Sequence, residues 1–181
     1  MLFRPTSLAL LAALLLCPPA YAHVEVAAEG TLLAVKIAED IASGDYERLL
    51  KGLRAHPGTF TRKVALLDNL GGHAAEAMRM GRLLRETGFE VLVPSDGVCQ
   101  GSCIYLLAAG TRRTIKGAVG LHRPYFAHGD SVHGNAGDRA NPAAYFKAMG
   151  VDARLAADMQ ATEPRRMKLL SAKDLAGYRL N

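Results

Sequence analysis

The sequence predicts an α/β domain with a mainly parallel sheet. Three observations lead to this prediction. Segments rich in β-branched and aliphatic residues alternate with segments whose apolar residues recur at helical spacing. Glycine- and proline-containing turns separate these segments. The resulting order of strand, helix, strand, helix is typical of a parallel sheet with crossover helices packed on it.

The first half of the chain supplies two strand–helix pairs. Leu32 to Ile41 alternates apolar and polar residues, which predicts a strand, and Tyr46 to Leu53 has one apolar helical face. Val64 to Leu67 predicts a short buried strand. Ala74 to Glu86 predicts a helix that ends at Thr87-Gly88.

The second half continues the alternation and then changes character. The expected elements are a strand over Phe89 to Val93, a helix over Cys103 to Ala109, short strands at Thr114-Ile115 and Val119 to His122, and later helices over Ala143 to Met149, Ala153 to Ala161 and Asp174 to Gly177. Between them, residues 124–142 are rich in Gly, Asn, Asp and His. This composition predicts a long surface loop or lid.

The N-terminus has the pattern of a secretory signal peptide over residues 1–22. Arg4 precedes an apolar run from Leu8 to Leu16, prolines break the run, and Ala20-Tyr21-Ala22 offers small residues for cleavage. An uncleaved anchor is the alternative, but the run is about half the roughly 20 residues that a membrane span needs. We therefore expect one domain over residues 23–181, located in the periplasm or secreted, with no stable membrane span after cleavage.

Composition and charge exclude some classes of partner. The formal net charge is +5, and the basic residues are scattered, with arginine doublets only at Arg112-Arg113 and Arg165-Arg166. A nucleic-acid face usually shows a basic stripe with aromatic residues for stacking, so we expect no nucleic-acid binding. The sequence has no phosphate-binding loop of the Gly-x4-Gly-Lys-Ser/Thr kind, and we expect no cofactor.

Two cysteines follow the signal peptide, Cys99 and Cys103. An even count in an exported chain favours a disulfide, and a spacing of four allows one if Cys99 lies just before a helix that holds Cys103. Two free, buried thiols are the alternative. Cys17 within the signal peptide follows Leu16, where a lipoprotein would have a small residue.

Three short segments hold candidate catalytic or ligand-binding residues. Gly71-Gly72 lies between a predicted strand and a helix, where exposed N–H groups can hold an oxyanion or a peptide carbonyl. Ser102 precedes a predicted helix, where a serine acts as a nucleophile or, more commonly, as an N-cap. His122 ends a predicted strand and is either a general base or a structural histidine.

A metal site is the less favoured interpretation of the histidine-rich loop. His128 and His133 lie there with Asp130 and Asp138. A His-x4-His pair in a Gly-rich loop lacks the rigid support that metal ligands need, so we expect no metal.

These segments, in this order, resemble the proteolytic subunit of the Clp protease, within the Clp/crotonase superfamily, and most closely an exported bacterial branch with a Cys-x-Ser-(Ala/Ser)-Cys motif. The resemblance covers about residues 33–180. It is carried by four stretches: Val64-Ala-Leu-Leu-Asp-Asn-Leu-Gly-Gly72, Cys103-Ile-Tyr-Leu-Leu-Ala-Ala-Gly110, Gly120-Leu-His-Arg-Pro-Tyr-Phe126 and Leu170-Ser-Ala-Lys-Asp-Leu-Ala-Gly-Tyr178. It implies a repeated β-β-α superhelix with a mainly parallel sheet.

The resemblance also implies site residues. Gly71 and Gly72, together with Gly101, would bind the oxyanion or substrate, and His122 would be the general base. Two departures stand out. The cysteine pair and Gly110 put Gly101, rather than a serine, in register with the nucleophile, so that Ser102 follows one residue later. The orienting acid falls where this chain has Arg165-Arg-Met167, with Glu163 and Asp158 nearby but out of register.

These residues favour two functions over a third. The first is a periplasmic serine hydrolase, expected to be a peptidase, with Ser102 as nucleophile and His122 as base. The second is a catalytically degenerate Clp-like domain that binds a peptide or a protein partner in the same groove. A crotonase-like acyl-CoA enzyme is third, because coenzyme A is scarce outside the cytoplasm. The resemblance also implies possible assembly into homo-oligomers.

Overall fold

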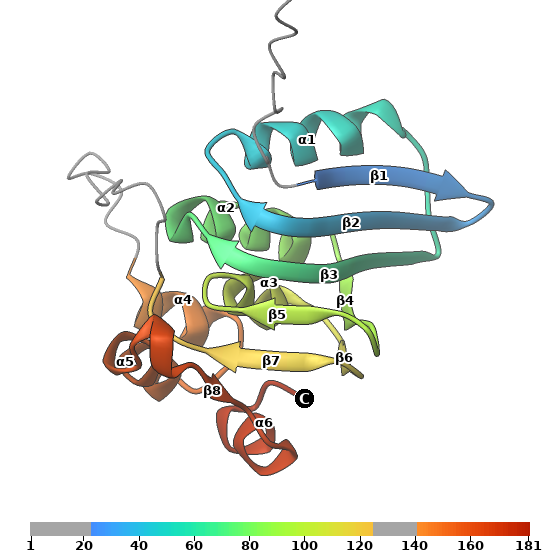
Figure 1. The fold of residues 1–181 in the computed structure, drawn as a ribbon. Coiled ribbons are helices and arrows are strands. Elements are labelled where there is room, and N and C mark those ends of the chain that lie inside the picture. Colours follow the sequence, from blue (N-terminus) through green and yellow to red (C-terminus); the bar gives the residue numbers. More distant parts are fainter. Residues whose placement is uncertain (1–22, 125–140) are drawn as a thin grey trace, which may run out of the picture.

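The computed structural model describes residues 23–124 and 141–181, and these residues form one mixed, mostly parallel sheet with helices against it (Figure 1). The elements are β1 (His23–Glu29), β2 (Leu32–Ile41), α1 (Asp45–Ala55), β3 (Arg62–Gly72), α2 (Ala74–Glu86), β4 (Glu90–Val93), β5 (Val98–Gln100), α3 (Cys103–Ala109), β6 (Arg113–Ile115), β7 (Ala118–Leu121), α4 (Pro142–Ala148), α5 (Arg154–Ala161), the 3-10 helix η1 (Pro164–Arg166), β8 (Lys168–Leu169) and α6 (Ala172–Tyr178). The predicted α/β class is confirmed.

The eight strands in the described part of the chain do not lie in one simple row. The main order is β1-β2-β3-β5-β7-β8, in which β1 and β8 are antiparallel to their neighbours and the inner pairs are parallel. The long strand β3 also pairs with β4 through residues 64–66, and β4 pairs with β6. The sheet therefore branches along β3, with β4 beside its first half and β5 beside Asn69.

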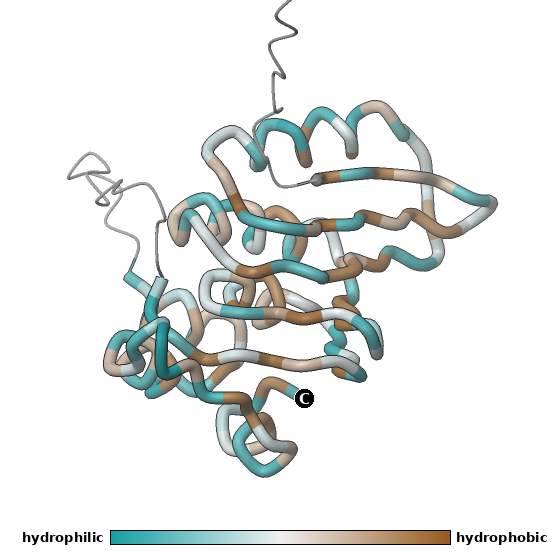
Figure 2. Tube along the Cα trace, viewed as in Figure 1, coloured by the Kyte–Doolittle hydropathy of each residue, from teal (hydrophilic) through white to brown (hydrophobic). Residues whose placement is uncertain are grey.

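Alternating burial along the strands points one set of side chains at the helices. In β2, Leu33, Val35 and Ile37 are buried, whereas Lys36 between them is exposed. Figure 2 shows the same alternation of apolar and polar residues along the central strands. The helix α3 lies deepest, with every residue from Cys103 to Ala109 buried. Because α3 begins directly after Ser102, one of the predicted site residues, its burial fixes the position of Ser102 in the domain.

Some strands differ from the sequence prediction. Strand β3 continues to Gly72, through the segment expected to be a loop, because Asp40 and Ile41 of β2 pair with both glycines. Strands β1 and β5 were not predicted, since each depends on pairing with a neighbour more than on its own residue pattern. The predicted lid over residues 124–142 lies outside the described residues except at its ends, where α4 begins at Pro142.

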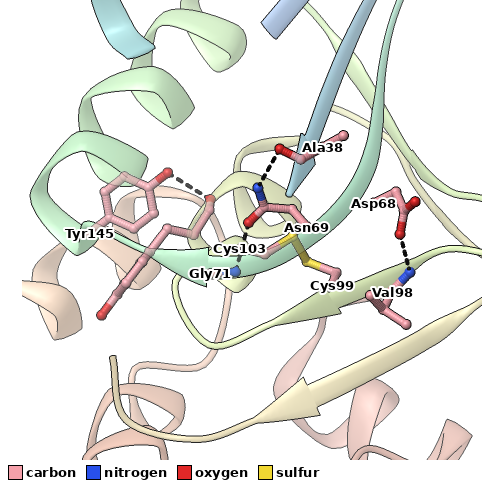
Figure 3. Close-up of a disulfide and its surroundings, with 9 residues drawn as sticks. Ala38, Asp68, Asn69, Gly71, Val98, Cys99, Cys103 and Tyr145 are labelled. Atoms are coloured by element: carbon pink, nitrogen blue, oxygen red, sulfur yellow. Dashed lines mark hydrogen bonds between the residues drawn. A yellow bond between two sulfur atoms is a disulfide. The ribbon is translucent and has the colours of Figure 1, made fainter. Parts of the chain in front are cut away.

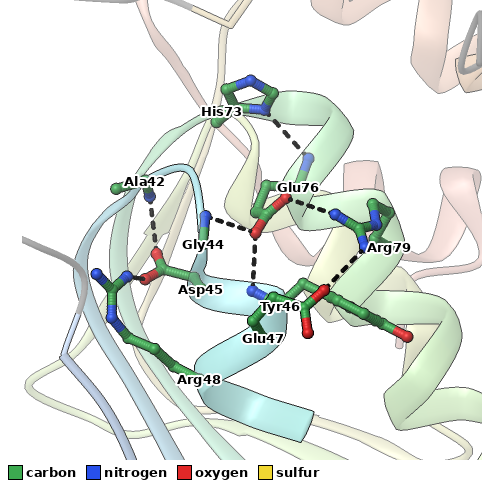
Figure 4. A network of polar contacts seen from close by, with 9 residues as sticks. All are labelled: Ala42, Gly44, Asp45, Tyr46, Glu47, Arg48, His73, Glu76 and Arg79. Carbon is green, nitrogen blue, oxygen red and sulfur yellow. Dashed lines mark hydrogen bonds and ion pairs between the residues drawn. The ribbon is translucent and has the colours of Figure 1, made fainter.

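A buried polar network joins α1 to α2 (Figure 4). The carboxylate of Glu76 accepts hydrogen bonds from the backbone N–H groups of Gly44 and Tyr46, at 2.9 and 2.8 Å. These are groups that the start of a helix leaves without intrahelical partners. Nearby, Asp45 accepts a hydrogen bond from Ala42 N and pairs with Arg48, yet burial raises the pKa of its carboxyl. A side chain of α2 thus caps α1 and fixes one helix on the other.

Tyr145 anchors α4 on the rest of the domain. Its hydroxyl donates to the carbonyl of Tyr105 at 2.8 Å, and its ring packs edge-to-face on the ring of Tyr105. The hydroxyl passes so close to α2 that a Cβ at Gly81 would lie 2.0 Å from it. A glycine in the middle of α2 therefore makes room for the anchor.

We predict that Gly81→Ala destabilises the protein by about 1–3 kcal/mol, because the added methyl group overpacks the contact with the Tyr145 hydroxyl. Equilibrium unfolding in urea measures the change. Gly177→Ala is the matched control, since nothing lies within 4 Å of a Cβ there and alanine is the better helix former. Adding Tyr145→Phe should recover part of the loss at Gly81, and equal losses in both backgrounds would contradict this explanation.

The last helix, α6, begins with a capping box that ties it to β8. The Ser171 hydroxyl and the Asp174 carboxylate each accept a backbone N–H of the other residue. The ammonium group of Lys168 in β8 donates to Asp174 at 2.7 Å. This hydrogen bond, followed by those from Ser171, holds the pKa of Asp174 well below its ordinary value of 3.8.

The capping box predicts a pH dependence of stability. A carboxyl whose pKa is lower in the folded than in the unfolded chain stabilises the fold above the unfolded pKa and loses that effect as the pH falls. We expect Asp174→Asn to lower the free energy of unfolding near pH 7, and the difference from wild type to shrink below about pH 4. Urea unfolding across pH checks this, with Asp96→Asn in an exposed turn as control. A difference that stays constant with pH would contradict the prediction.

Candidate functional site

The predicted site segments meet at the carboxyl ends of three adjacent strands. The Gly-Gly segment ends β3, the Gly101 turn follows β5, and His122 follows β7. The order β3-β5-β7 in the sheet makes these ends neighbours. In open α/β sheets, ligands bind in the crevice outside the carboxyl ends of the strands. The topology therefore brings Gly71, Gly72, Gly101 and His122 to the place where a ligand is expected.

The disulfide prediction is confirmed. Cys99 at the centre of β5 and Cys103 at the start of α3 form a disulfide, with 5.2 Å between their Cα atoms (Figure 3). Both residues are fully buried. The bond closes a loop around Gln100, Gly101 and Ser102, and so holds the turn between strand and helix in one shape.

Gly101 is the residue of this turn that faces His122. Its φ of +49° lies in the left-handed region that glycine adopts at least cost. A Cβ built on Gly101 would lie 2.6 Å from Cε1 and 3.0 Å from Nε2 of His122. A side chain at position 101 would thus run into the imidazole, and glycine lets the ring pack directly on the turn.

Ser102 lies one residue further and its hydroxyl is engaged elsewhere. The residue is fully buried, and Oγ donates to the carbonyl oxygen of Gly72 at 2.8 Å. This hydrogen bond ties the start of α3 to the end of β3. The predicted nucleophile is therefore positioned as a structural link between the two segments, and it is Gly101 that lies against the histidine.

His122 is held by the backbone that follows it. Its Nδ1 lies 2.8 Å from the carbonyl oxygen of Arg123, which assigns the proton to Nδ1 and leaves Nε2 as the acceptor on the side of Gly101. The ring is nearly buried, at 8% exposure. The ring is therefore fixed, with Nε2 on the side of Gly101.

Among the described residues, no carboxylate contacts His122. The two acids that the sequence places nearby have other partners: Asp158 accepts a hydrogen bond from Tyr178 Oη at 2.6 Å, and Glu163 lies 4.0 Å from Arg166. A backbone carbonyl thus takes the place that an orienting acid has in a Ser-His-Asp triad.

The Gly-Gly segment is shaped by a residue that the sequence analysis missed, Asn69. Its fully buried side chain donates to Ala38 O at 3.4 Å and accepts the N–H of Gly71 at 2.8 Å. The N–H of Gly71, a predicted oxyanion donor, is therefore already bound inside the protein. An asparagine in an otherwise apolar strand, two residues before a glycine, is the signal that could have revealed this contact.

Close backbone approach explains the first glycine of the pair. A Cβ at Gly71 would lie 2.9 Å from Gln100 O and 3.0 Å from Ser102 N, and the φ of Gly71 is +101°. The end of β3 and the disulfide-bound turn thus pack backbone against backbone. A larger residue at position 71 would push the turn away from its place beside His122.

The remaining predictions concern metals and membranes. Over residues 23–124 and 141–181, no group of three or more His, Cys, Asp or Glu side chains is arranged to hold a metal ion. The histidine pair His128 and His133, with Asp130 and Asp138, lies outside the described residues. None of the helices in the described part of the chain has the length and apolar character that crossing a membrane requires.

Comparison with known proteins gives no relative from which residue roles could be transferred. No model of a known protein family matches the chain, and no curated protein matches it either.

The disulfide predicts a measurable stabilisation. In the chain-entropy model, closing a loop of five residues is worth about 2 kcal/mol. We expect the double variant Cys99→Ala/Cys103→Ala to unfold about 2 kcal/mol more easily than oxidised wild type in urea. Alkylation followed by mass spectrometry should find neither cysteine modified in the native protein, because both are buried and bonded. Rapid alkylation of Cys99 without prior reduction would contradict the assignment.

Proposed function

We propose that this chain is an exported Clp protease-like domain that binds an extended peptide or a protein partner and has no serine nucleophile of its own. The observation that carries the proposal is the geometry at position 101. The position that points at Nε2 of His122 is a glycine, and the neighbouring serine is buried with its hydroxyl on Gly72.

The fold supports the resemblance on which this proposal rests. A mainly parallel sheet that branches at β3 suits a superhelix of repeated β-β-α units. The Gly-Gly segment, the turn before a buried helix and the strand-end histidine lie together. The disulfide suits an exported protein, because such bonds persist in oxidising compartments.

The geometry favours binding over hydrolysis for two reasons. First, Ser102 would have to break its hydrogen bond to Gly72 and rotate out of the core before its hydroxyl could reach His122. The disulfide resists that change, since it spans the same turn. Second, the N–H of Gly71 is occupied by Asn69, which removes one donor that an oxyanion would use. Nothing in this arrangement activates a serine hydroxyl.

The same geometry suits the binding of an extended backbone. Nε2 of His122 offers an acceptor for a ligand N–H at the carboxyl ends of the strands, and the close packing of the ring on Gly101 holds this nitrogen in place. Self-association, which the resemblance also implies, stays a prediction.

A fluorophosphonate probe, which labels activated serines, tests the proposal. We expect no labelling of the folded wild type and no change in Ser102→Ala. Gly101→Ser should gain weak labelling, because its hydroxyl would face His122 once the ring moves slightly from its 2.6 Å contact with the new Cβ. We expect that labelling to disappear in Gly101→Ser/His122→Ala.

Circular dichroism provides the control that each variant is folded. Labelling of the wild type that is lost in both Ser102→Ala and His122→Ala would overturn the proposal. The chain would then be a serine hydrolase, and the turn would have to rearrange in solution.

A further inference from the structure

The segment after α5 makes a detour beside His122. On one side of the histidine, the N–H of Arg123 donates to Thr162 O at 2.8 Å. On the other side, Leu121 pairs with Lys168 in β8. Between these two contacts, the strand side has one residue, His122, whereas the segment that faces it has five, residues 163–167, which include η1.

This detour places positive charge around the histidine. Arg165 and Arg166 lie within it, and Arg123 and Lys168 lie at its two ends; all four are exposed. Arg166 lies 4.0 Å from Glu163, and Lys168 pairs with Asp174 at 2.7 Å. Within residues 23–124 and 141–181, Arg123 and Arg165 form no ion pair, so the surface beside His122 keeps an excess of positive charge.

Apolar side chains lie next to this charge. Leu70 and Leu169 are the large hydrophobic side chains of the described residues that stay exposed, at 50% and 62%. Leu169 pairs with Gly120. Asn69 pairs with Cys99, and Cys99 pairs with Val119. One residue further along each strand, Leu70 is therefore in register with Gly120.

The pairing register therefore puts both leucines in one row across the sheet, at the end where the site lies. Neighbouring strands are about 4.8 Å apart, so the row from β3 to β8 spans about 14 Å. A strand rises about 3.3 Å per residue, so an extended peptide of four to five residues covers that distance. Met167 covers Gly120 in the middle of the row, since a Cβ at Gly120 would lie 2.4 Å from its sulfur. The row therefore offers an extended segment the side chains of Leu70, Met167 and Leu169.

We infer that the ligand is a peptide segment in which acidic side chains accompany apolar ones. This inference rests on the proposed function, on the positive charge beside His122 and on the row that holds Leu70 and Leu169. The leucines would contact the apolar side chains, and Arg123 and Arg165 would attract the carboxylates. Charge complementarity of this kind mainly sets which partner binds and how fast. Beside His122, acidic side chains are favoured over basic ones because Arg123 and Arg165 have no carboxylate partner among the described residues. The exposed carboxylates Glu39, Asp40 and Asp68 lie at the other, Leu70 end of the row.

Three matched peptides test the inference. Each is ten residues long, acetylated at the N-terminus, amidated at the C-terminus and labelled with an uncharged dye, with Leu at the same positions. The variable positions are Glu, Gln or Lys. Fluorescence anisotropy with the purified protein at low salt should show the Glu peptide binding about tenfold more tightly than the Gln peptide, and the Lys peptide most weakly. The preference should shrink as salt is added.

Variants locate the effect. Arg123→Gln and Arg165→Gln should each weaken binding of the Glu peptide by about two- to fivefold and leave binding of the Gln peptide unchanged. Arg54→Gln is the control, because Arg54 is equally exposed but lies on α1. Leu169→Ser should weaken both peptides.

The outcomes distinguish a failure of the inferred acidic and apolar ligand from a failure of the proposed peptide binding. Equal binding of the Glu and Gln peptides, or tighter binding of the Lys peptide, would overturn the inference and leave peptide binding intact. An equal loss in Arg54→Gln would overturn the assignment to Arg123 and Arg165. No binding of any of the three would count against the proposed function itself.

Discussion

The close packing of two backbone segments, the end of β3 and the turn that enters α3, is the contact on which the rest of the site depends. Gly71 lies where a Cβ would be 2.9 Å from Gln100 O, and Ser102 Oγ bonds to Gly72 O at 2.8 Å. The disulfide between Cys99 and Cys103 closes the same turn on itself. With three constraints on one short segment, the turn has little freedom, and Gly101 is held against His122.

That constraint decides what the site can do. Gly101 and Ser102 lie in the turn before α3, and Gly101 has a left-handed φ of +49°, so side chains at positions 101 and 102 point in different directions. The Ser102 hydroxyl points into the core and stabilises the fold. The histidine keeps a free acceptor nitrogen, and a backbone carbonyl fixes its ring. The proposed binding function rests on this geometry, in which the histidine faces a glycine and the hydroxyl of the neighbouring serine is bound to Gly72.

Much of this could be predicted from the sequence, and the reasons for success and failure are physical. The helices α2 and α3 were predicted closely because their apolar spacing and the glycine-containing turns after them are local signals. Strand β5, at three residues, carries no periodic signal and exists through its pairing with β3 and β7. The meeting of the glycines with His122 was expected from the resemblance alone, and the alignment of the carboxyl ends of β3, β5 and β7 accounts for it. The link from Asn69 to Gly71 has a signal in the sequence, an asparagine two residues before a glycine, but the direction of the Asn69 side chain is set by the pairing of β3 with its neighbours.

The most direct test is a long-range ¹H–¹⁵N NMR spectrum of His122 in the purified protein, recorded without and with a saturating peptide of apolar and acidic residues. The account predicts a proton on Nδ1, hydrogen-bonded to the carbonyl oxygen of Arg123, and a Nε2 resonance that shifts when the peptide binds. A proton on Nε2 in the free protein, or a Nε2 resonance that stays in place while the peptide is bound, would contradict the proposal that Nε2 of His122 accepts a hydrogen bond from the ligand.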